Sequence, residues 1–131
     1  MKKRYSILLF LLFSILLSGC TSQSVEKPDQ MLKLIDDAVK ITEKSINEKD
    51  LKLARTVWTQ ISEYGVKATE LDKKELADSL GKLASTYVYL VAYIETGEEL
   101  QLTTFRSCFG QAVSQLKQYV MTQQGSKLDK Q

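Results

Sequence analysis

The chain has 131 residues, which is enough for one domain with a single hydrophobic core. Its formal net charge of +2 comes from Lys2, Lys3 and Arg4, because the rest of the chain carries 15 basic and 16 acidic side chains. A near-neutral body lacks the cationic surface that binds phosphate backbones, so we expect no nucleic-acid partner. Histidine is absent, which excludes histidine-dependent catalytic triads and removes the commonest protein ligand of metal ions.

The first nineteen residues have the pattern of a bacterial signal peptide. The cationic start is followed by an apolar run from Ile7 to Leu17, interrupted only by Ser14. A run of this length is too short to cross a bilayer, which takes about 20 residues. It ends in Leu17-Ser18-Gly19-Cys20, where an aliphatic residue and two small residues precede a cysteine. This ending resembles the lipobox of bacterial lipoproteins.

The resemblance implies how the mature protein is attached to a membrane. Residues 1–19 would be cleaved off between Gly19 and Cys20, and a diacylglyceryl group would be transferred to the Cys20 sulfur, often with N-acylation. Two acyl chains anchor a protein stably, whereas one chain gives reversible binding. The expected location is the extracytoplasmic face of the cytoplasmic membrane, or the outer membrane where the host has one. An uncleaved signal anchor with an unmodified Cys20 is the alternative.

A short polar tether, residues 20–28, is expected to keep the domain close to the bilayer. The first helix is expected to begin with Asp29 as its N-cap. A second helical segment follows, for which Asp50 is the expected cap. Neither Gly nor Pro separates the two, so one helix from Asp29 to Thr69 is the alternative, but it would outrun its partners. The predicted apolar faces hold Met31, Ile35, Ala38, Val39, Thr42, Ser45 and Ile46, and then Ala54, Val57, Trp58, Ile61, Tyr64, Gly65 and Ala68.

The third segment has the clearest start and stop signals. Asp72 and Glu75 stand at capping-box-like spacing, and Gly97 is a natural residue to end the helix. The fourth segment begins after Gly97 and is expected to end at Gly125, before a disordered tail, 126–131. The predicted apolar faces hold Leu76, Leu80, Leu83, Tyr87, Val91 and Ile94, and then Leu102, Phe105, Phe109, Ala112, Leu116, Tyr119 and Val120.

Four segments of about 20 to 25 residues joined by short turns predict an all-α fold, a small antiparallel four-helix bundle over residues 29–125. Three helices, the first of them long, are the alternative. Trp58, Phe105 and Phe109 are the predicted core anchors. Cys108 lies at the edge of an apolar stripe and has no disulfide partner if Cys20 is lipidated. We expect it to behave as a small hydrophobic residue.

The charged pairs in the helices do not predict a catalytic or metal site. Asp36 and Asp37, like Glu98 and Glu99, are neighbours in the sequence and therefore diverge by about 100° around a helix. The glycines form no phosphate-binding loop, and no calcium-loop pattern is present. We therefore predict no enzymatic activity, no metal and no cofactor.

Charge is unevenly distributed along the sequence. Residues 27–82 carry 22 ionisable groups, whereas residues 83–131 carry 8. In this second part, Tyr89 and Tyr93 lie one turn apart, and the fourth segment presents Gln111, Gln115 and Gln118 on its outward side. A weakly charged surface with tyrosines is typical of protein interfaces, so we predict that these five residues bind a partner. In the alternative, the third helix is central and Leu83 to Ile94 is simply buried.

These observations predict a membrane-anchored, non-enzymatic interaction module at the cell envelope. Its partner would be another envelope protein or a peptide arriving from outside. The general build is similar to that of immunity and exclusion lipoproteins of plasmids, phages and bacteriocin systems, a similarity of architecture and not of residues. The alternatives are an assembly accessory of a secretion, conjugation or cell-wall complex, and a small-ligand-binding lipoprotein with a pocket between its helices.

Overall fold

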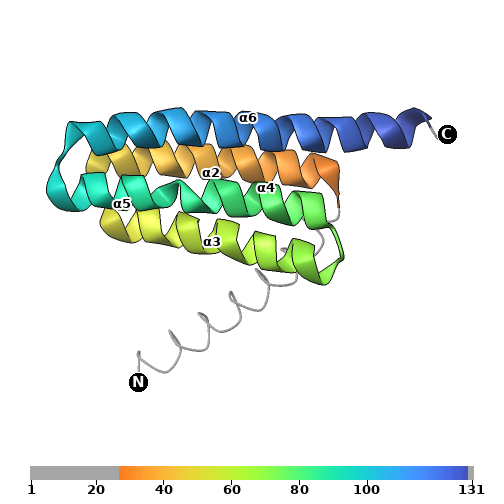
Figure 1. The fold of residues 1–131 in the computed structure, drawn as a ribbon, viewed down its shortest axis with the longest axis horizontal. Coiled ribbons are helices and arrows are strands. Elements are labelled where there is room, and N and C mark those ends of the chain that lie inside the picture. Colours follow the sequence, from red (N-terminus) through yellow and green to blue (C-terminus); the bar gives the residue numbers. More distant parts are fainter. Residues whose placement is uncertain (1–26, 130–131) are drawn as a thin grey trace, which may run out of the picture.

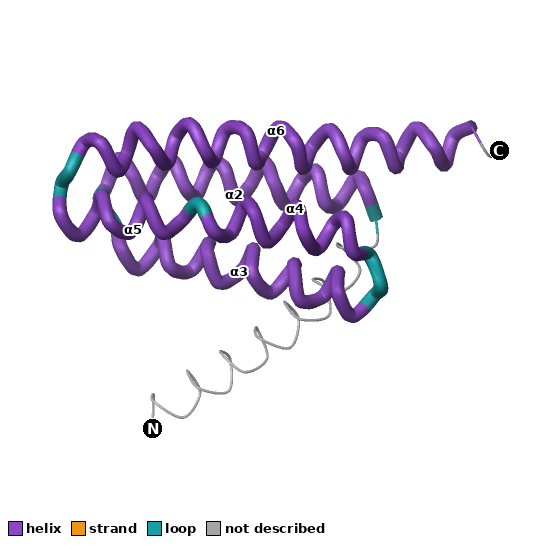
Figure 2. Tube along the Cα trace, viewed as in Figure 1, coloured by secondary structure: helices purple, strands orange, loops and turns teal. Residues whose placement is uncertain are grey.

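The computed structural model describes residues 27–129, with side chains up to Gln124, and the regular structure in that range is entirely helical. The helices pack side by side as a bundle, and α4 and α5 follow one another along one position in it (Figures 1 and 2). This confirms the predicted all-α fold. The predicted signal peptide, the lipidation site Cys20 and residues 21–26 of the tether lie outside the described residues. The helices are α2 (Pro28–Glu48), α3 (Leu51–Glu70), α4 (Lys74–Ser85), α5 (Tyr87–Thr96) and α6 (Glu99–Asp129).

A tight turn separates α2 from α3, so the alternative of one long helix is wrong. Lys49 adopts a left-handed conformation with φ of 50°, and its N–H group donates to the Ile46 carbonyl at 3.2 Å. Asp50 then caps α3 as predicted, because its Oδ1 accepts a hydrogen bond from the Leu53 N–H at 3.0 Å. Glycine usually occupies this left-handed position at the end of a helix, but here it is a lysine. The sequence therefore has no glycine to indicate where α2 ends.

Two predicted helix starts are wrong. Lys27 is the N-cap of α2, and Pro28 is its first helical residue, which places Asp29 within the first turn where its charge favours the helix dipole. The capping box expected from Asp72 does not form, because Lys73 is the N-cap of α4 and makes no side-chain capping bond. Asp72 instead has φ of 59° and belongs to the turn that ends α3, where its N–H group donates to the Thr69 carbonyl.

Thr86 interrupts the predicted third helix. Its backbone N–H and its hydroxyl both donate to the Leu83 carbonyl, at 3.2 and 2.7 Å. A threonine side chain that bonds to a nearby carbonyl competes with the regular helical pattern, so α4 and α5 are separate helices on one path.

The predicted end at Gly97 is confirmed, since Gly97 adopts φ of 76° and donates to the Tyr93 carbonyl. The predicted end of the last helix at Gly125 is wrong. Helix α6 continues to Asp129, through four residues that the sequence assigned to a disordered tail.

The core lies where the apolar faces of the helices meet. Phe105 and Phe109 are buried in it as predicted, and their rings stack at 4.9 Å between centroids. Trp58 is only partly buried, so its prediction as a core anchor is wrong. It lies about 100° around α3 from the buried Val57, at the border of the apolar stripe. Cys108 is half-buried and is a free cysteine. Its predicted behaviour as a small hydrophobic residue stays a prediction.

Candidate interaction surface

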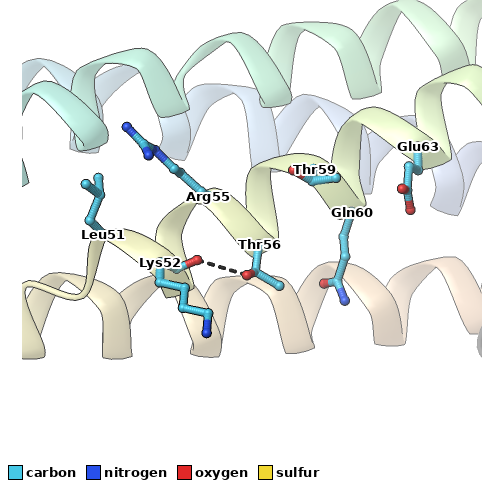
Figure 3. Close-up of a pocket in the computed structure, with 7 residues that line it drawn as sticks. All are labelled: Leu51, Lys52, Arg55, Thr56, Thr59, Gln60 and Glu63. Atoms are coloured by element: carbon cyan, nitrogen blue, oxygen red, sulfur yellow. Dashed lines mark hydrogen bonds between the residues drawn. The ribbon is translucent and has the colours of Figure 1, made fainter. Parts of the chain in front are cut away.

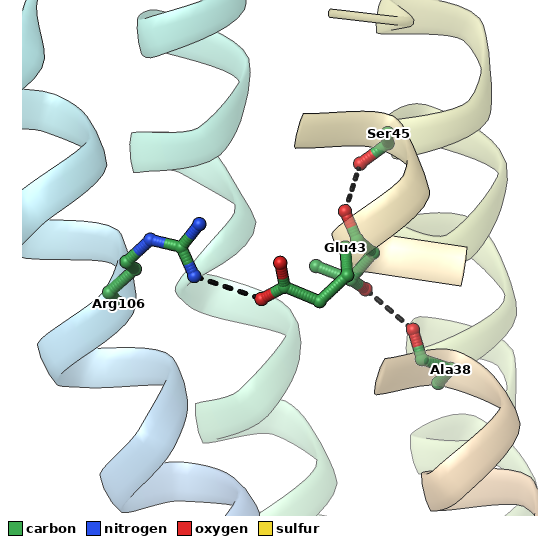
Figure 4. Close-up of polar contacts among 5 residues, drawn as sticks. Ala38, Glu43, Ser45 and Arg106 are labelled. Carbon is green, nitrogen blue, oxygen red and sulfur yellow. Dashed lines mark hydrogen bonds and ion pairs between the residues drawn. The ribbon is translucent and has the colours of Figure 1, made fainter. Parts of the chain in front are cut away.

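Polar contacts show which edges of α2 and α6 face each other. Three pairs join these helices, and residue numbers rise along α2 as they fall along α6. Figure 4 shows one of them, in which the Arg106 guanidinium reaches the Glu43 carboxylate. The α6 residues of these pairs mark the edge of α6 that faces α2. The pairs are Glu43–Arg106, Asp36–Lys117 and Asp29–Gln124, at 2.9, 2.8 and 2.6 Å.

The three predicted glutamines lie on the other side of α6. Gln111, Gln115 and Gln118 are all exposed. Each is displaced by roughly 110° to 170° around the helix from the edge that faces α2, given about 100° per residue. Since α6 also packs against α4 and α5, the glutamines lie on the side of α6 nearest to those helices.

Tyr89 lies on the matching side of α5. The salt bridge between Arg55 and Glu95, with 3.2 Å between nitrogen and oxygen, marks the edge of α5 that faces α3. Tyr89 is displaced by about 120° from Glu95 around the helix, toward α6, and is 38% exposed. Four of the five predicted residues therefore share one face of the bundle along the seam between α4–α5 and α6. We call Tyr89, Gln111, Gln115 and Gln118 the α5–α6 face.

Tyr93 does not belong to this face, and its prediction as a surface residue is wrong. Its side chain is 7% exposed, and the Lys49 ammonium lies 5.9 Å from the centre of its ring. Helix α5 is apolar around most of its circumference, so its sequence pattern does not distinguish the inward side from the outward side. The alternative of a fully buried stretch from Leu83 to Ile94 is also wrong, because Val88 is exposed as well as Tyr89.

A buried hydroxyl pair ties α2 to α5. The Thr42 hydroxyl donates to the Ala38 carbonyl at 2.6 Å, so its single proton is already used. The Tyr87 hydroxyl, 2.8 Å away, must therefore be the donor to Thr42 Oγ1. Burial raises the pKa of Tyr87, although the bond to Thr42 lowers it in part. A fully paired phenol with a raised pKa is not a base near neutral pH, and the pair is structural.

A second surface, which the sequence analysis did not predict, is a shallow groove of about 650 Å³ on α3. Figure 3 shows that Arg55 points toward α5, whereas Lys52 and Gln60 point toward α2. The short side chains of Thr56 and Thr59 lie between these long ones, which leaves the hollow. A pattern of short residues flanked by long ones on one helix face was the available signal. The lining residues are Leu51, Lys52, Arg55, Thr56, Thr59, Gln60 and Glu63.

No protein family matches the chain, and no curated protein or solved structure matches it. Within residues 27–129, no helix has both the length and the apolar character needed to span a bilayer. Within the same residues, no group of three or more acidic or cysteine side chains is arranged so that it could hold a metal ion.

Proposed function

We propose that this protein is a bacterial lipoprotein, anchored by acyl chains on Cys20, whose helical domain binds another envelope protein or a peptide without catalysing a reaction. The observation that carries the proposal is the coincidence, within 20 residues, of a cationic start, a short apolar run and Leu17-Ser18-Gly19-Cys20. Each feature alone is common, but an anchored lipoprotein needs all three in this order.

We also propose that the bundle is an antiparallel four-helix bundle in which α4 and α5 together form one of the four elements. Contacts between neighbouring helices support this arrangement. As residue numbers rise along one helix, the numbers of the residues it contacts on the neighbouring helix fall. Asp36 pairs with Lys117, Arg55 pairs with Glu95, and a β-carbon on Gly65 would lie 3.7 Å from that of Leu80. Short turns at 49–50, 71–73 and 97–98 favour the same arrangement.

The tether joins the bundle at the N-terminus of α2. Residues 20–27 span at most about 29 Å when fully extended, so the domain stays within about one bundle length of the membrane. In the proposed antiparallel arrangement, the turns at 49–50 and 97–98 lie at the opposite end from the tether. A partner must therefore itself be in the envelope or reach the membrane surface.

The α5–α6 face is the proposed binding surface. It offers one aromatic ring and three primary amides without a formal charge, and each amide can donate and accept hydrogen bonds. Tyrosine is enriched at interfaces because it provides a large rigid contact area and a polar tip. A partner with hydrogen-bonding side chains or an extended backbone fits this chemistry.

A photo-crosslinking amino acid at Gln115, in the lipidated protein in its own membrane, tests the proposed surface. We expect a discrete adduct from this position, and none from the same group at Lys40, an exposed residue of α2. Tyr89→Ser should reduce the Gln115 adduct and leave the domain folded, because Tyr89 is partly exposed. Equal adducts from both positions, or none from Gln115, would reject the α5–α6 face.

A further inference from the structure

The outward side of α3 carries a central row of side chains and an open groove. Lys52, Thr59 and Val66 follow one another at intervals of seven residues, and Val66 is 60% exposed. A second shallow hollow continues the groove from Trp58 to Val66. The short side chains of Thr59 and Ser62 lie among its lining residues. We call the outward residues Lys52, Arg55, Thr59, Glu63, Val66 and Glu70 the α3 outer face.

The charges of these six residues differ in sign between the two halves of the helix, although the cation Lys67 lies beside Glu70 in the C-terminal half. Lys52 and Arg55 lie in the N-terminal half, and Glu63 and Glu70 lie in the C-terminal half. For these four residues the order is opposite to the one that the helix dipole favours, whereas Lys67 in the last turn is favourably placed. Among the described residues, Lys52 and Glu63 have no ion-pair partner. Arg55 pairs with Glu95 and Glu70 pairs with Lys67, but both pairs are exposed and therefore contribute little to stability.

We propose that two copies of the chain associate through their α3 outer faces, antiparallel, around a two-fold axis at Thr59. Residues equally far before and after Thr59 then face each other across the axis. Arg55 of one copy exchanges its exposed pair with Glu95 for one with Glu63 of the partner copy, and the symmetry forms this ion pair twice. Val66 lies against the methylene stem of Lys52, and the two Thr59 side chains meet at the centre. Thr56 and Thr59, which Figure 3 shows in the groove of one chain, are short, and this allows a close approach of the two helices.

A polar contact of this size is weak between dilute molecules, and anchoring in one membrane raises the local concentration. A two-fold axis along the membrane normal lays both bundles flat on the bilayer, with their tethers at opposite ends. This membrane argument rests on the proposed lipid anchor, whereas complementarity of the two faces does not. The association goes beyond the proposed partner binding, because it uses α3 and leaves the α5–α6 face open.

Disulfide formation at the axis tests the pairing in membranes that contain the full chain. In a Cys108→Ser background, Thr59→Cys places one thiol next to its symmetry mate, and mild oxidation should give a disulfide-linked dimer. Thr103→Cys, on an exposed part of α6, is the matched control and should give on the order of tenfold less dimer. Equal yields from the two positions, or no dimer from Thr59→Cys, would overturn the proposal. Dimer from Cys108→Ser alone would instead reveal a free Cys20 thiol and count against lipidation.

Charge reversal separates ion pairing from a change in folding. Arg55→Glu and Glu63→Arg should each lower the Thr59→Cys dimer yield by about fivefold, the effect of losing roughly 1 kcal/mol of exposed pairing. The two changes together restore opposite charges across the axis and should recover the yield. A double variant that forms no more dimer than either single variant would contradict the antiparallel register.

Discussion

At the scale of single residues, Tyr87 joins the aromatic part of the core to a buried pair of hydroxyl groups. Its ring packs against Phe105 at 5.7 Å and against Phe109 at 5.8 Å, between centroids, while its hydroxyl donates to Thr42. Ser45 adds a hydrogen bond from its hydroxyl to the Thr42 carbonyl at 2.7 Å. Each of these buried hydroxyls is therefore paired, and the pairing fixes the position of α2 against α5.

High pH should destabilise the domain partly through Tyr87. Its raised pKa means that the folded state favours the neutral phenol. The contribution of the neutral Tyr87 phenol to the free energy of unfolding is complete below the usual tyrosine pKa of about 10. It is lost as the pH rises above that value. Urea unfolding between about pH 8 and about pH 10.5 should therefore show a smaller loss of stability in Tyr87→Phe than in the unaltered chain. The same loss in both proteins would contradict this account.

Two other tyrosines, Tyr64 and Tyr119, also have a raised pKa. Burial, followed by the nearby carboxylates of Glu63 and Asp37, raises the pKa of Tyr64. Burial and the charge of Glu75 also raise the pKa of Tyr119. These groups act in the same direction as Tyr87, so some loss of stability at high pH should remain in Tyr87→Phe.

The sequence predicted the burial of residues that lie at the centre of an apolar stripe, such as Phe105. It did not correctly predict the burial of residues at the border of a stripe. Trp58 lies on such a border and stays partly exposed. Tyr93 is buried, which its sequence pattern could not indicate because α5 has apolar residues on most sides. Helical periodicity gives the direction of a face when polar residues alternate with apolar ones, and α5 offers too few polar residues for this.

At the scale of helices, the ends depend on backbone conformations that side chains reveal only in part. Gly97 was predicted because glycine adopts a left-handed conformation at no steric cost. Lys49 and Asp72 adopt similar conformations without being glycine, so the turns that contain them had no comparable signal. The existence and order of the helices could be predicted from periodicity. The cap residues of α2 and α4 could be identified only from the backbone conformation of the folded chain.

Two glycine substitutions should change stability in opposite directions. Gly97→Ala places a β-carbon on a residue with φ of 76°, which should cost about 1 kcal/mol. Gly81→Ala lies inside α4, where an added β-carbon has no neighbour within 4 Å, and should gain up to about 1 kcal/mol. Thermal unfolding of the two variants measures both effects. Changes of the same sign would show that one of these backbone assignments is incorrect.

At the scale of the whole molecule, short turns were enough to predict a helical bundle, because consecutive helices must then be neighbours. The surfaces were harder to predict. The glutamines of α6 could be placed on an outward side, but their position beside Tyr89 depends on which edges the pairs Glu43–Arg106 and Arg55–Glu95 bring together. The groove on α3 depends on two neighbouring helices that leave this side uncovered.

The proposed lipid anchor would determine how both proposed surfaces are used, since it would confine the domain to a membrane and limit which partners it meets. Mass spectrometry of the intact protein extracted from membranes tests this directly. We expect a chain that begins at Cys20 and carries a diacylglyceryl group on its sulfur, and Cys20→Ser should abolish the added mass. A mature chain with an unmodified Cys20, or an uncleaved chain that begins at Met1, would contradict this expectation.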